Sequence, residues 1–583
     1  MKLKRVKEIL FNHRLAILFA VILAFIVAFP QVYFRIDHQS DGVYQGIELL
    51  PDSPWSARVR EVQDGHPNFG AIYYKDGKDN PYLFQPLGSM VVGYVGELFS
   101  LDINNTILLS RIILSFIVFI LIYVFVFLLS KSRLTALCSS TVLLFAESIL
   151  SFSGLSRLFH GLNPDSFLRI ARPVNPAMIY VLLFSFLICF WFFYKKNDWR
   201  WGVASAILLG LNFYNYFYSW TFLYSFGAIL ILFFLCQKRW REALRLAGVF
   251  LGALLVAFPY CVNLYRATMH PAYVEVGARN GIVLTHAPLF VGLTAIIALI
   301  VFFLGFPKED REKYFFSLAL LLTPFITLNQ QLLTGRVLQE AHYHWFFHKP
   351  IAVIVVLIVI LHLLASRGFV LTRKVIAGII LTVSIFTGVF VQAETYFNDS
   401  RDGGMIAVER QKYGPVMKWL NENALKESVV LANDEISHLT VIYTPLNVFY
   451  HRAAMYSLAS TKARLLDVLF TFYRLRGIKA GDAREVFFAE RGNISANIYG
   501  IHYRELLGSY DAIPDDKIEE AVNLYIKSQS EDSQNWFKRV FKKYEVGYVV
   551  WDKKSDPSWQ LDAYQNLVKA AELPNDMLIY RVQ

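Results

Sequence analysis

Long apolar runs, separated by short polar segments, occupy the first two thirds of the chain. The first run, residues 15–34, follows a basic segment and exceeds the ~18 residues that can cross a hydrocarbon core. It is too long for the apolar region of a signal peptide. Ten further runs follow, over about residues 106–130, 133–152, 176–194, 200–216, 218–236, 243–265, 286–306, 314–333, 346–365 and 373–394. We therefore predict a polytopic α-helical membrane protein with about eleven transmembrane helices.

Residues 395–583 follow a different pattern. Polar, helix-like stretches alternate with short β-like runs. The helix-like stretches are 416–428, 516–528 and 535–544, and the β-like runs are 428–434, 439–445, 546–552 and 577–582. Such alternation is typical of an α/β unit. We expect a transmembrane domain over residues 1–394, with a first external loop at 34–105, and a soluble α/β domain over residues 395–583.

Composition and charge agree with this division. The 583 residues are 55% hydrophobic and only 18% charged, which argues against a wholly soluble protein. The net charge is +11, but residues 395–583 hold 24 Lys and Arg against 25 Asp and Glu, so the basic excess belongs to residues 1–394. A basic membrane part favours contact with anionic membrane lipids and argues against a nucleic-acid partner.

The basic residues also predict an orientation. They recur in the N-terminal tail and in the short connections at about residues 131–133, 195–200, 238–245, 308–313 and 367–374, which lie on one side of the predicted bundle. Short connections rich in Lys and Arg face the cytoplasm. We expect a plasma-membrane protein with a cytoplasmic N-terminus and an extracytoplasmic C-terminal domain.

The first external loop holds the main candidate for catalysis. Asp52 begins a D-x-P-W sequence and precedes a short predicted helix. Its carboxylate either caps that helix or serves in catalysis. Arg58 and His66 follow in the same loop and are candidates for binding a substrate or its phosphate. Loops of this length are commonly functional.

A first transmembrane helix, a long external loop with Asp52, many further spans and an external α/β domain together resemble the GT-C membrane glycosyltransferases. The resemblance implies a sugar donor linked to polyprenyl phosphate and a first-loop Asp that acts as base or orients the acceptor. The chain departs from better-known branches, because it has no WWDYG motif, no second acid beside Asp52 and no clear DxD or ExD in its second external loop. A divalent metal, Mg²⁺ or Mn²⁺, therefore stays an open question.

The second external loop, about residues 153–175, contains Asp165, a second candidate catalytic residue that assists the reaction or binds a metal. Four cationic candidates surround it in sequence: Arg157, His160, Arg169 and Arg172. Arginine offers a fork of donors that matches phosphate oxygens. The alternative is that these side chains anchor helix ends at the membrane interface, and that Asp165 belongs to an ordinary turn.

A polar segment continues from the end of an apolar run near residue 329. Its candidates for lining a sugar or phosphate cavity are Asn329, Gln330, Gln331, Arg336, His342 and His344. Polar groups within a membrane span are costly unless they face a cavity or a partner. The alternative is hydrogen bonding between helices by the three amides, with a solvated loop after them.

These residues and the resemblance predict an inverting glycosyltransferase, with a polyprenyl-phosphate-linked sugar as donor and a lipid, glycan or protein as acceptor. Asp52 would take the proton of the acceptor hydroxyl, and the cations would stabilise the departing phosphate. A lipid or solute transporter, or a receptor with an external binding domain, is the alternative. A transporter, however, would place charges deep within helices and often has two related halves.

Overall fold

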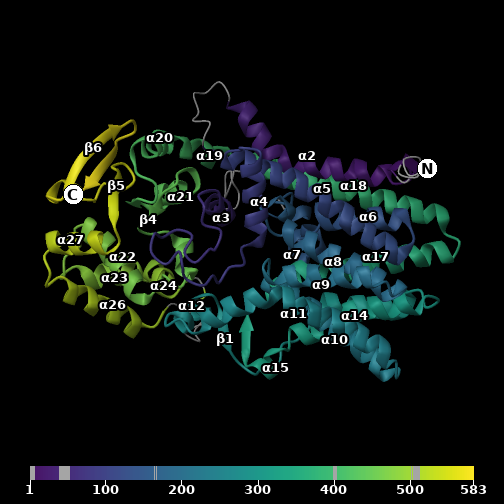
Figure 1. The fold of residues 1–583 in the computed structure, drawn as a ribbon. Coiled ribbons are helices and arrows are strands. Elements are labelled where there is room, and N and C mark those ends of the chain that lie inside the picture. The colour runs from purple at the N-terminus through teal and green to yellow at the C-terminus, as the bar shows by residue number, and fades with distance from the viewer. Residues whose placement is uncertain are drawn as a thin grey trace.

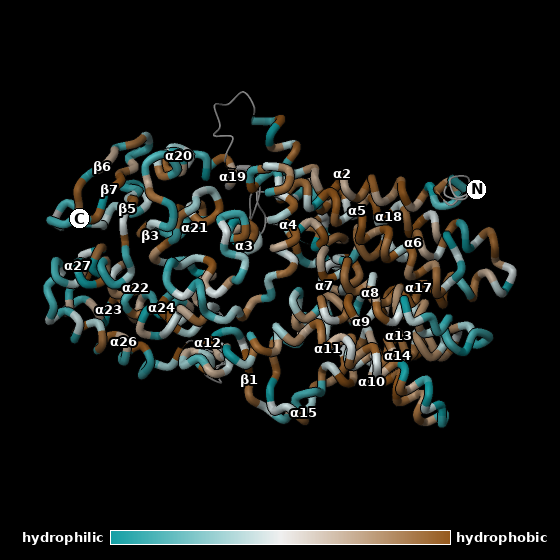
Figure 2. Tube along the Cα trace, in the orientation of Figure 1, coloured by the Kyte–Doolittle hydropathy of each residue, from teal (hydrophilic) through white to brown (hydrophobic). Residues whose placement is uncertain are grey.

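The structure is a computed structural model that describes residues 7–8, 10–38, 47, 53–162, 165, 167–397, 404–500, 502 and 513–583. Figure 1 shows a bundle of long helices beside a sheet with its own helices, and Figure 2 shows hydrophobic residues concentrated in the bundle. Within the described ranges, eight helices are long and apolar enough to cross a membrane. Six of them are α2 (Arg14–Asp37), α5 (Ile103–Ser130), α8 (Ala177–Lys196), α10 (Phe217–Cys236), α11 (Trp240–Thr268) and α18 (Val370–Phe397). The other two spans are Arg311–Thr334, which contains α14 (Arg311–Thr327), and Ala341–Ser366, which contains α17 (Lys349–Ser366).

This architecture confirms the predicted polytopic helical fold with a C-terminal α/β part, but it does not confirm eleven spans. Three of the predicted spans form shorter helices: α6 (Arg133–Phe145), α9 (Trp199–Phe213) and α13 (Leu293–Gly305). The run predicted at 133–152 breaks after α6, where Glu147 and two serines interrupt the apolar sequence. The residues after α6 do not continue the helix, and several of them line a polar cavity that is described below.

The first external loop contains two helices. The predicted short helix is confirmed as α3 (Ser53–Gln63), and α4 (Leu87–Leu98) packs against it. At Gly93 of α4, an added Cβ would lie 2.8 Å from Val62 of α3, so the close approach requires glycine. The loop is therefore a packed structure.

Short elements fill the regions between the long helices. Between α6 and α8 lie η1 (Ser148–Leu150), α7 (Phe152–Phe159) and η2 (Arg169–Ala171). Between α11 and α17 lie α12 (Tyr273–Arg279), β1 (Ile282–Leu284), α15 (Gln331–Thr334), β2 (Arg336–Leu338), α16 (Ala341–Tyr343) and the π-helix η3 (His344–His348). β1 and β2 pair antiparallel.

The C-terminal part is built on a five-stranded sheet in the order β4-β3-β5-β7-β6. The strands are β3 (Val429–Leu431), β4 (Asn447–Val448), β5 (Val546–Asp552), β6 (Leu567–Leu573) and β7 (Met577–Val582). β3 runs parallel to β4 and β5, whereas β7 is antiparallel to β5 and β6.

Helices cover both faces of this sheet because alternate strand residues point to opposite sides. In β5, Val549 belongs to the core under α22 (Lys462–Leu475), α26 (Asp515–Ser528) and α27 (Ser533–Lys543), and Val550 belongs to the core under α20 (Gly414–Asn423) and α21 (Asp434–Tyr443). The remaining described helices of this part are short. They are α19 (Gly404–Arg410), α23 (Ala483–Ala489) and α24 (Arg491–Tyr499), with the 3₁₀ helices η4 (Gln411–Tyr413), η5 (Arg452–Tyr456) and η6 (Leu561–Ala563).

The strand prediction at 439–445 is wrong. That segment lies largely in α21, which begins after Asn433, whose side chain accepts a hydrogen bond from the Ile436 N–H (3.0 Å). The cap and the acidic first turn of Asp434 and Glu435 favour a helix there despite the β-branched residues that follow. The edge strand β6 was not predicted, since most of its residues are exposed and show no apolar alternation.

The first external loop packs against the C-terminal part. Arg464, on α22, is buried and forms an ion pair with Asp76, and its guanidinium lies 3.5 Å from the centre of the Tyr74 ring. His66 contributes a second link, with its Nε2 3.0 Å from Glu427 Oε1. The position of α3 is therefore tied to the C-terminal sheet.

A buried histidine pair lies at this junction. His451 stacks on Tyr73 of the first loop (4.3 Å between ring centres), and its Nδ1 accepts a hydrogen bond from the Ala453 N–H (3.1 Å). The network thus leaves the proton on Nε2 of His451, which donates to Nδ1 of His438 (3.2 Å). Burial lowers the pKa of His438 and that of His451 to about 3, so both rings are neutral near pH 7.

This pair predicts acid sensitivity. Between pH 7 and pH 5 the unfolded histidines take up protons and the folded ones do not, so the free energy of unfolding should fall by about 2 kcal/mol per histidine. His438→Gln should flatten the pH dependence, measured as unfolding temperature in detergent across this range. Exposed His286, replaced by Gln, serves as the control. An unchanged slope in His438→Gln would contradict the assignment.

Candidate functional site

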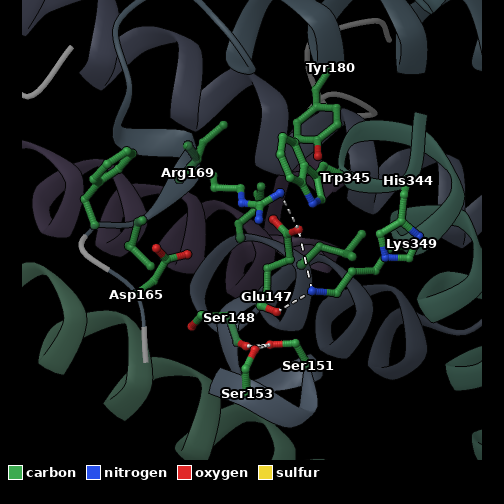
Figure 3. Close-up of a pocket in the computed structure, with 15 residues that line it drawn as sticks. Glu147, Ser148, Ser151, Ser153, Asp165, Arg169, Tyr180, His344, Trp345 and Lys349 are labelled. Carbon is green, nitrogen blue, oxygen red and sulfur yellow. Dashed lines mark hydrogen bonds and ion pairs between the residues drawn. The ribbon is translucent and has the colours of Figure 1, made fainter. Parts of the chain in front are cut away.

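A cavity of about 310 Å³ lies where the chain leaving α6 meets α8 and the start of α17. We call it the Glu147 cavity. Its polar and aromatic lining consists of Glu147, Ser148, Ser151, Ser153, Asp165, Phe167, Arg169, Tyr180, His344, Trp345 and Lys349. Figure 3 shows these side chains gathered from the segment after α6, the second external loop, α8 and the η3–α17 junction. The volume is at the lower end of the range for small-molecule sites.

A tight turn shapes one wall of the cavity. The Ser151 hydroxyl accepts a hydrogen bond from the Gly154 N–H (3.1 Å) and donates one to the Ser148 carbonyl (2.9 Å). An added Cβ at Gly154 would lie 2.1 Å from that carbonyl, so the turn requires glycine. The turn joins η1 to α7 and holds the serines at the cavity wall.

Two cations share one carboxylate in the cavity. Glu147 Oε1 lies 3.5 Å from Arg169 Nη1 and 3.8 Å from Lys349 Nζ. Lys349 Nζ also donates a hydrogen bond to the main-chain carbonyl of Glu147 (2.8 Å). Lys349 is only 7% exposed, so its charge depends on this partner. With these three groups ionised, the cluster has one net positive charge, and an ionised Asp165 in the same cavity would offset it.

Several polar atoms of the cavity are buried without a hydrogen bond from the described part of the chain. They are Glu147 Oε1, Arg169 Nη1 and Ser148 Oγ. The ion-pair distances above exceed hydrogen-bond length, so the ion pairs leave these atoms available. Buried polar atoms are normally paired, and unpaired ones at a cavity indicate a place for a ligand or water.

Aromatic rings complete the cavity. Trp345 belongs to the π-helix η3, and the Arg169 guanidinium lies 5.2 Å from its ring centre. Short π-helical turns often occur at functional sites. Tyr180 contributes a buried ring from α8, and His344 lines the same cavity. A partly exposed tryptophan beside cations can stack on the apolar face of a sugar ring.

Of the residues proposed from sequence, Asp165, Arg169 and His344 line the Glu147 cavity. Figure 3 shows Asp165 on the other side of Arg169 from Glu147. Arg157 is exposed on α7, and His160 is exposed directly after that helix, with its Nδ1 2.7 Å from the Ser156 carbonyl oxygen. Arg172 follows η2, with its guanidinium 5.8 Å from the Phe167 ring centre. These last three do not line the cavity.

The first-loop candidates lie elsewhere. Asp52 falls outside the described residues. The Arg58 guanidinium is buried between the rings of Trp55 (4.5 Å) and Phe84 (4.3 Å). His66 contacts Glu427, as described above. Arg58 therefore packs within the first loop, and His66 links this loop to the C-terminal part. Neither residue lines the Glu147 cavity.

The three amides proposed from the polar segment bind main-chain groups. Asn329 Oδ1 accepts from the Leu289 N–H (3.0 Å), Gln330 Nε2 donates to the Arg336 carbonyl (2.7 Å), and Gln331 Nε2 donates to the Ala287 carbonyl (3.0 Å). They brace the loops next to β1 and β2.

The other residues of that segment lie apart from each other. Arg336 is exposed on β2. His342 lies against Tyr216, with Nδ1 2.5 Å from the tyrosine hydroxyl, and its ring centre is 5.5 Å from that of Trp345. Of this segment, only His344 reaches the Glu147 cavity.

Sequence reasoning missed Glu147 and Lys349, the centre of the charge cluster. Both carried a signal, because each is an ionisable residue within or at the end of a long apolar run. Trp345 and Tyr180 carried no such signal, since aromatic residues are frequent throughout this chain.

The cavity was also tested for a metal. Across the described ranges, no three His, Cys, Asp or Glu side chains are placed to hold a metal ion. The sequence left dependence on Mg²⁺ or Mn²⁺ open, and no step below depends on a metal.

Comparisons with known proteins give structural matches alone. No family model and no curated protein matches the chain. Solved structures similar over 98% of this chain include ArnT from Cupriavidus metallidurans bound to undecaprenyl phosphate, arabinofuranosyltransferase AftD from Mycobacteria, and an Archaeoglobus fulgidus oligosaccharyltransferase tethered with an acceptor peptide. All three are GT-C glycosyltransferases, the class that the sequence resembles.

The similarity to these structures is distant. The TM-scores are 0.48, 0.49 and 0.44, with identities of 10%, 10% and 13%. The matches cover 98% of the ArnT chain, 40% of the AftD chain and 74% of the oligosaccharyltransferase chain. These values are too low to assign an activity to this chain.

The charge cluster gives a stability prediction. Glu147→Gln removes the negative charge shared by Arg169 and Lys349, and breaking a buried pair in this way should cost about 3 kcal/mol of unfolding free energy. Thermal unfolding in detergent measures the change. Glu312→Gln is the matched control, because Glu312 pairs with Lys195 at 3.3 Å but both side chains are 41% exposed, so little change is expected. Equal effects of the two substitutions would contradict a buried, coupled cluster.

Proposed function

We propose that the protein is an integral membrane glycosyltransferase that transfers a sugar from a polyprenyl-phosphate carrier to an acceptor on the extracytoplasmic face. The observation that carries this proposal is the Glu147 cavity, which combines two cations, two carboxylates and a tryptophan beside an exposed apolar helix. The acceptor is a hydroxyl group of a lipid, a glycan or a protein. The orientation follows from the basic short connections, with the N-terminus in the cytoplasm.

Arg169 and Lys349 fit the phosphate of the donor. Arg169 Nη1 is buried and forms no hydrogen bond with a described residue, and Lys349 Nζ forms an ion pair with the same carboxylate, that of Glu147. Phosphate oxygens would accept from both cations, which gives charge-assisted hydrogen bonds to the leaving group. The sugar would then lie against Trp345, between the phosphate and Asp165.

Helix α7 fits the lipid chain of the donor. Phe152 and Phe159, seven residues apart on one helical face, are 89% and 81% exposed, and Leu155 lies between them. Ser151 and Ser153, at the start of the same helix, line the cavity. An apolar face that begins at a polar cavity suits a ligand with a charged head and a long apolar tail.

The reaction would be a direct displacement at C1 of the sugar. A carboxylate takes the proton of the acceptor hydroxyl as its oxygen bonds to C1, and the bond from C1 to the phosphate oxygen breaks with its electron pair staying on the phosphate. The products are the glycosylated acceptor and the polyprenyl phosphate. Asp165 in the cavity and Asp52 are the candidate bases, and the configuration at C1 inverts.

Catalytic roles are tested with purified protein in lipid and a panel of labelled polyprenyl-phosphate sugars. We expect sugar transfer by the wild type, and a loss of about 100-fold or more in kcat when the base is replaced. Asp165→Asn and Asp52→Asn are compared in the same assay. Arg169→Gln should lower the rate by a similar factor, because it removes a donor to the developing phosphate charge.

The control for these variants is Asp79→Asn, an exposed carboxylate of the first loop that should leave turnover unchanged. Full turnover in both Asp165→Asn and Asp52→Asn would exclude the assigned bases. Movement of the intact carrier lipid across the membrane, with the sugar retained, would instead favour a transporter. Binding without either activity, with acceptors and divalent metals supplied, would favour a receptor.

The role of α7 predicts a dependence on carrier length. Phe152→Ser with Phe159→Ser should raise KM for a long polyprenyl carrier by about 10-fold or more, since each ring would lose its apolar contact with the lipid. KM for a short, water-soluble carrier should not change. Phe258→Ser on α11 alters an exposed aromatic away from the cavity and is the control. Equal changes for both carriers would contradict a lipid-binding role of α7.

A further inference from the structure

A second pocket lies between the start of α2, the end of α5 and the start of α6, away from the Glu147 cavity. We call it the N-terminal pocket. Its volume is about 370 Å³, and it is lined by Phe11, Asn12, His13, Arg14, Leu15, Ala16, Tyr123, Arg133, Leu134 and Leu137. Figure 1 places this end of the bundle opposite the C-terminal sheet. None of the proposed glycosyltransferase steps uses these residues.

The pocket is basic. Its lining, as far as the chain is described, includes Arg14, Arg133 and His13 but no Asp or Glu. The Arg14 guanidinium lies over the Phe11 ring at 4.3 Å, and neither Arg14 nor Arg133 forms an ion pair with a described residue. Arginines usually find an anion when one is within reach, so two unpaired guanidinium groups at one pocket favour an anionic ligand.

A hydrogen bond fixes the inner wall. His13 Nδ1 lies 2.7 Å from the Tyr123 hydroxyl, and the His13 ring packs edge-on against Phe127 at 5.2 Å. This contact holds the start of α2 against the end of α5. The two arginines project from the first residues of α2 and α6, so the positive ends of both helix dipoles add to the basic character.

The rim of the pocket is apolar and open to the surroundings. Phe11, Leu15 and Leu18 are each more than half exposed, and the last two lie one helical turn apart on α2. Leu134 and Leu137 form the facing wall. A free phosphate ion would use the cations alone, whereas a phospholipid would use the cations for its phosphate and the leucines for its acyl chains.

We propose that the N-terminal pocket binds the phosphate headgroup of an anionic phospholipid, in the membrane leaflet that faces the N-terminus. Arg14 and Arg133 hold the phosphate, Asn12 donates to it, and the acyl chains run along Leu15 and Leu18. The lipid joins α2, α5 and α6 at this end of the bundle.

The test uses the full chain in detergent, titrated with phosphatidylglycerol, phosphatidylcholine or inorganic phosphate and followed by native mass spectrometry. The wild type should bind phosphatidylglycerol in preference to phosphatidylcholine. Arg14→Gln with Arg133→Gln should weaken phosphatidylglycerol binding by about 10-fold or more, since each basic side chain near an anionic lipid contributes about 1 kcal/mol. High concentrations of inorganic phosphate should compete with the lipid.

The matched control is Arg241→Gln with Arg367→Gln, two exposed arginines outside the pocket whose loss removes the same net charge. A loss equal to that of the pocket variant would mean general charge attraction and would overturn the proposal. No preference for phosphatidylglycerol in the wild type, a result that needs no variant to fold, would also overturn it. Binding of inorganic phosphate without binding of lipid would assign the pocket to a free anion and refute the lipid.

Discussion

The ionic contact of Glu147 with Arg169 and Lys349 is the interaction on which the candidate site depends. It joins the segment after α6, the second external loop and the first residue of α17, which are far apart in the sequence. A lysine that is 7% exposed at the start of an apolar helix would be costly alone, because desolvating a charge is expensive without a partner. The shared carboxylate of Glu147 offsets the cost of burying the Lys349 charge and joins the segments that form the cavity walls.

The C-terminal part supports the membrane part through the first external loop. Arg464 and Asp76 form one link, and Lys78 adds another through Glu61 (2.5 Å) and Glu427 (3.7 Å). Glu61 lies on α3, the helix that directly follows Asp52, and α21 packs against the same helix. Burial raises the pKa of Glu61 to about 8, and the charge of Lys78 opposes this shift. The C-terminal part, through these contacts with the first loop, limits where the start of α3 can lie.

Sequence patterns predicted the long apolar helices and six C-terminal elements, namely α20, α26, α27, β3, β5 and β7, because their periodicity follows directly from burial. The sequence patterns failed where tertiary contacts determine the local structure. The segment at 439–445 is β-branched and apolar, yet the Asn433 cap and packing under the sheet make it helical. Asp165, Arg169 and His344, which line the cavity, were candidates because they are ionisable residues in predicted loops. Glu147 was not a candidate, because it lies within a predicted span. The ends of that span could not be predicted from hydropathy, since the break after α6 is set by the turn at Ser151 and Gly154.

The balance of charge in the Glu147 cavity bears on turnover in the proposed reaction. The phosphate monoester of the released carrier bears more negative charge than the phosphodiester of the donor, so two unopposed cations would bind the product more tightly and would slow its release. Glu147 offsets one of the two charges and leaves the cations 3.5 Å and 3.8 Å from its oxygen, beyond hydrogen-bond length. The cations can therefore move toward the phosphate as charge develops on it and return to Glu147 when the carrier leaves. The same carboxylate that allows Lys349 to be buried would then keep the product from being held.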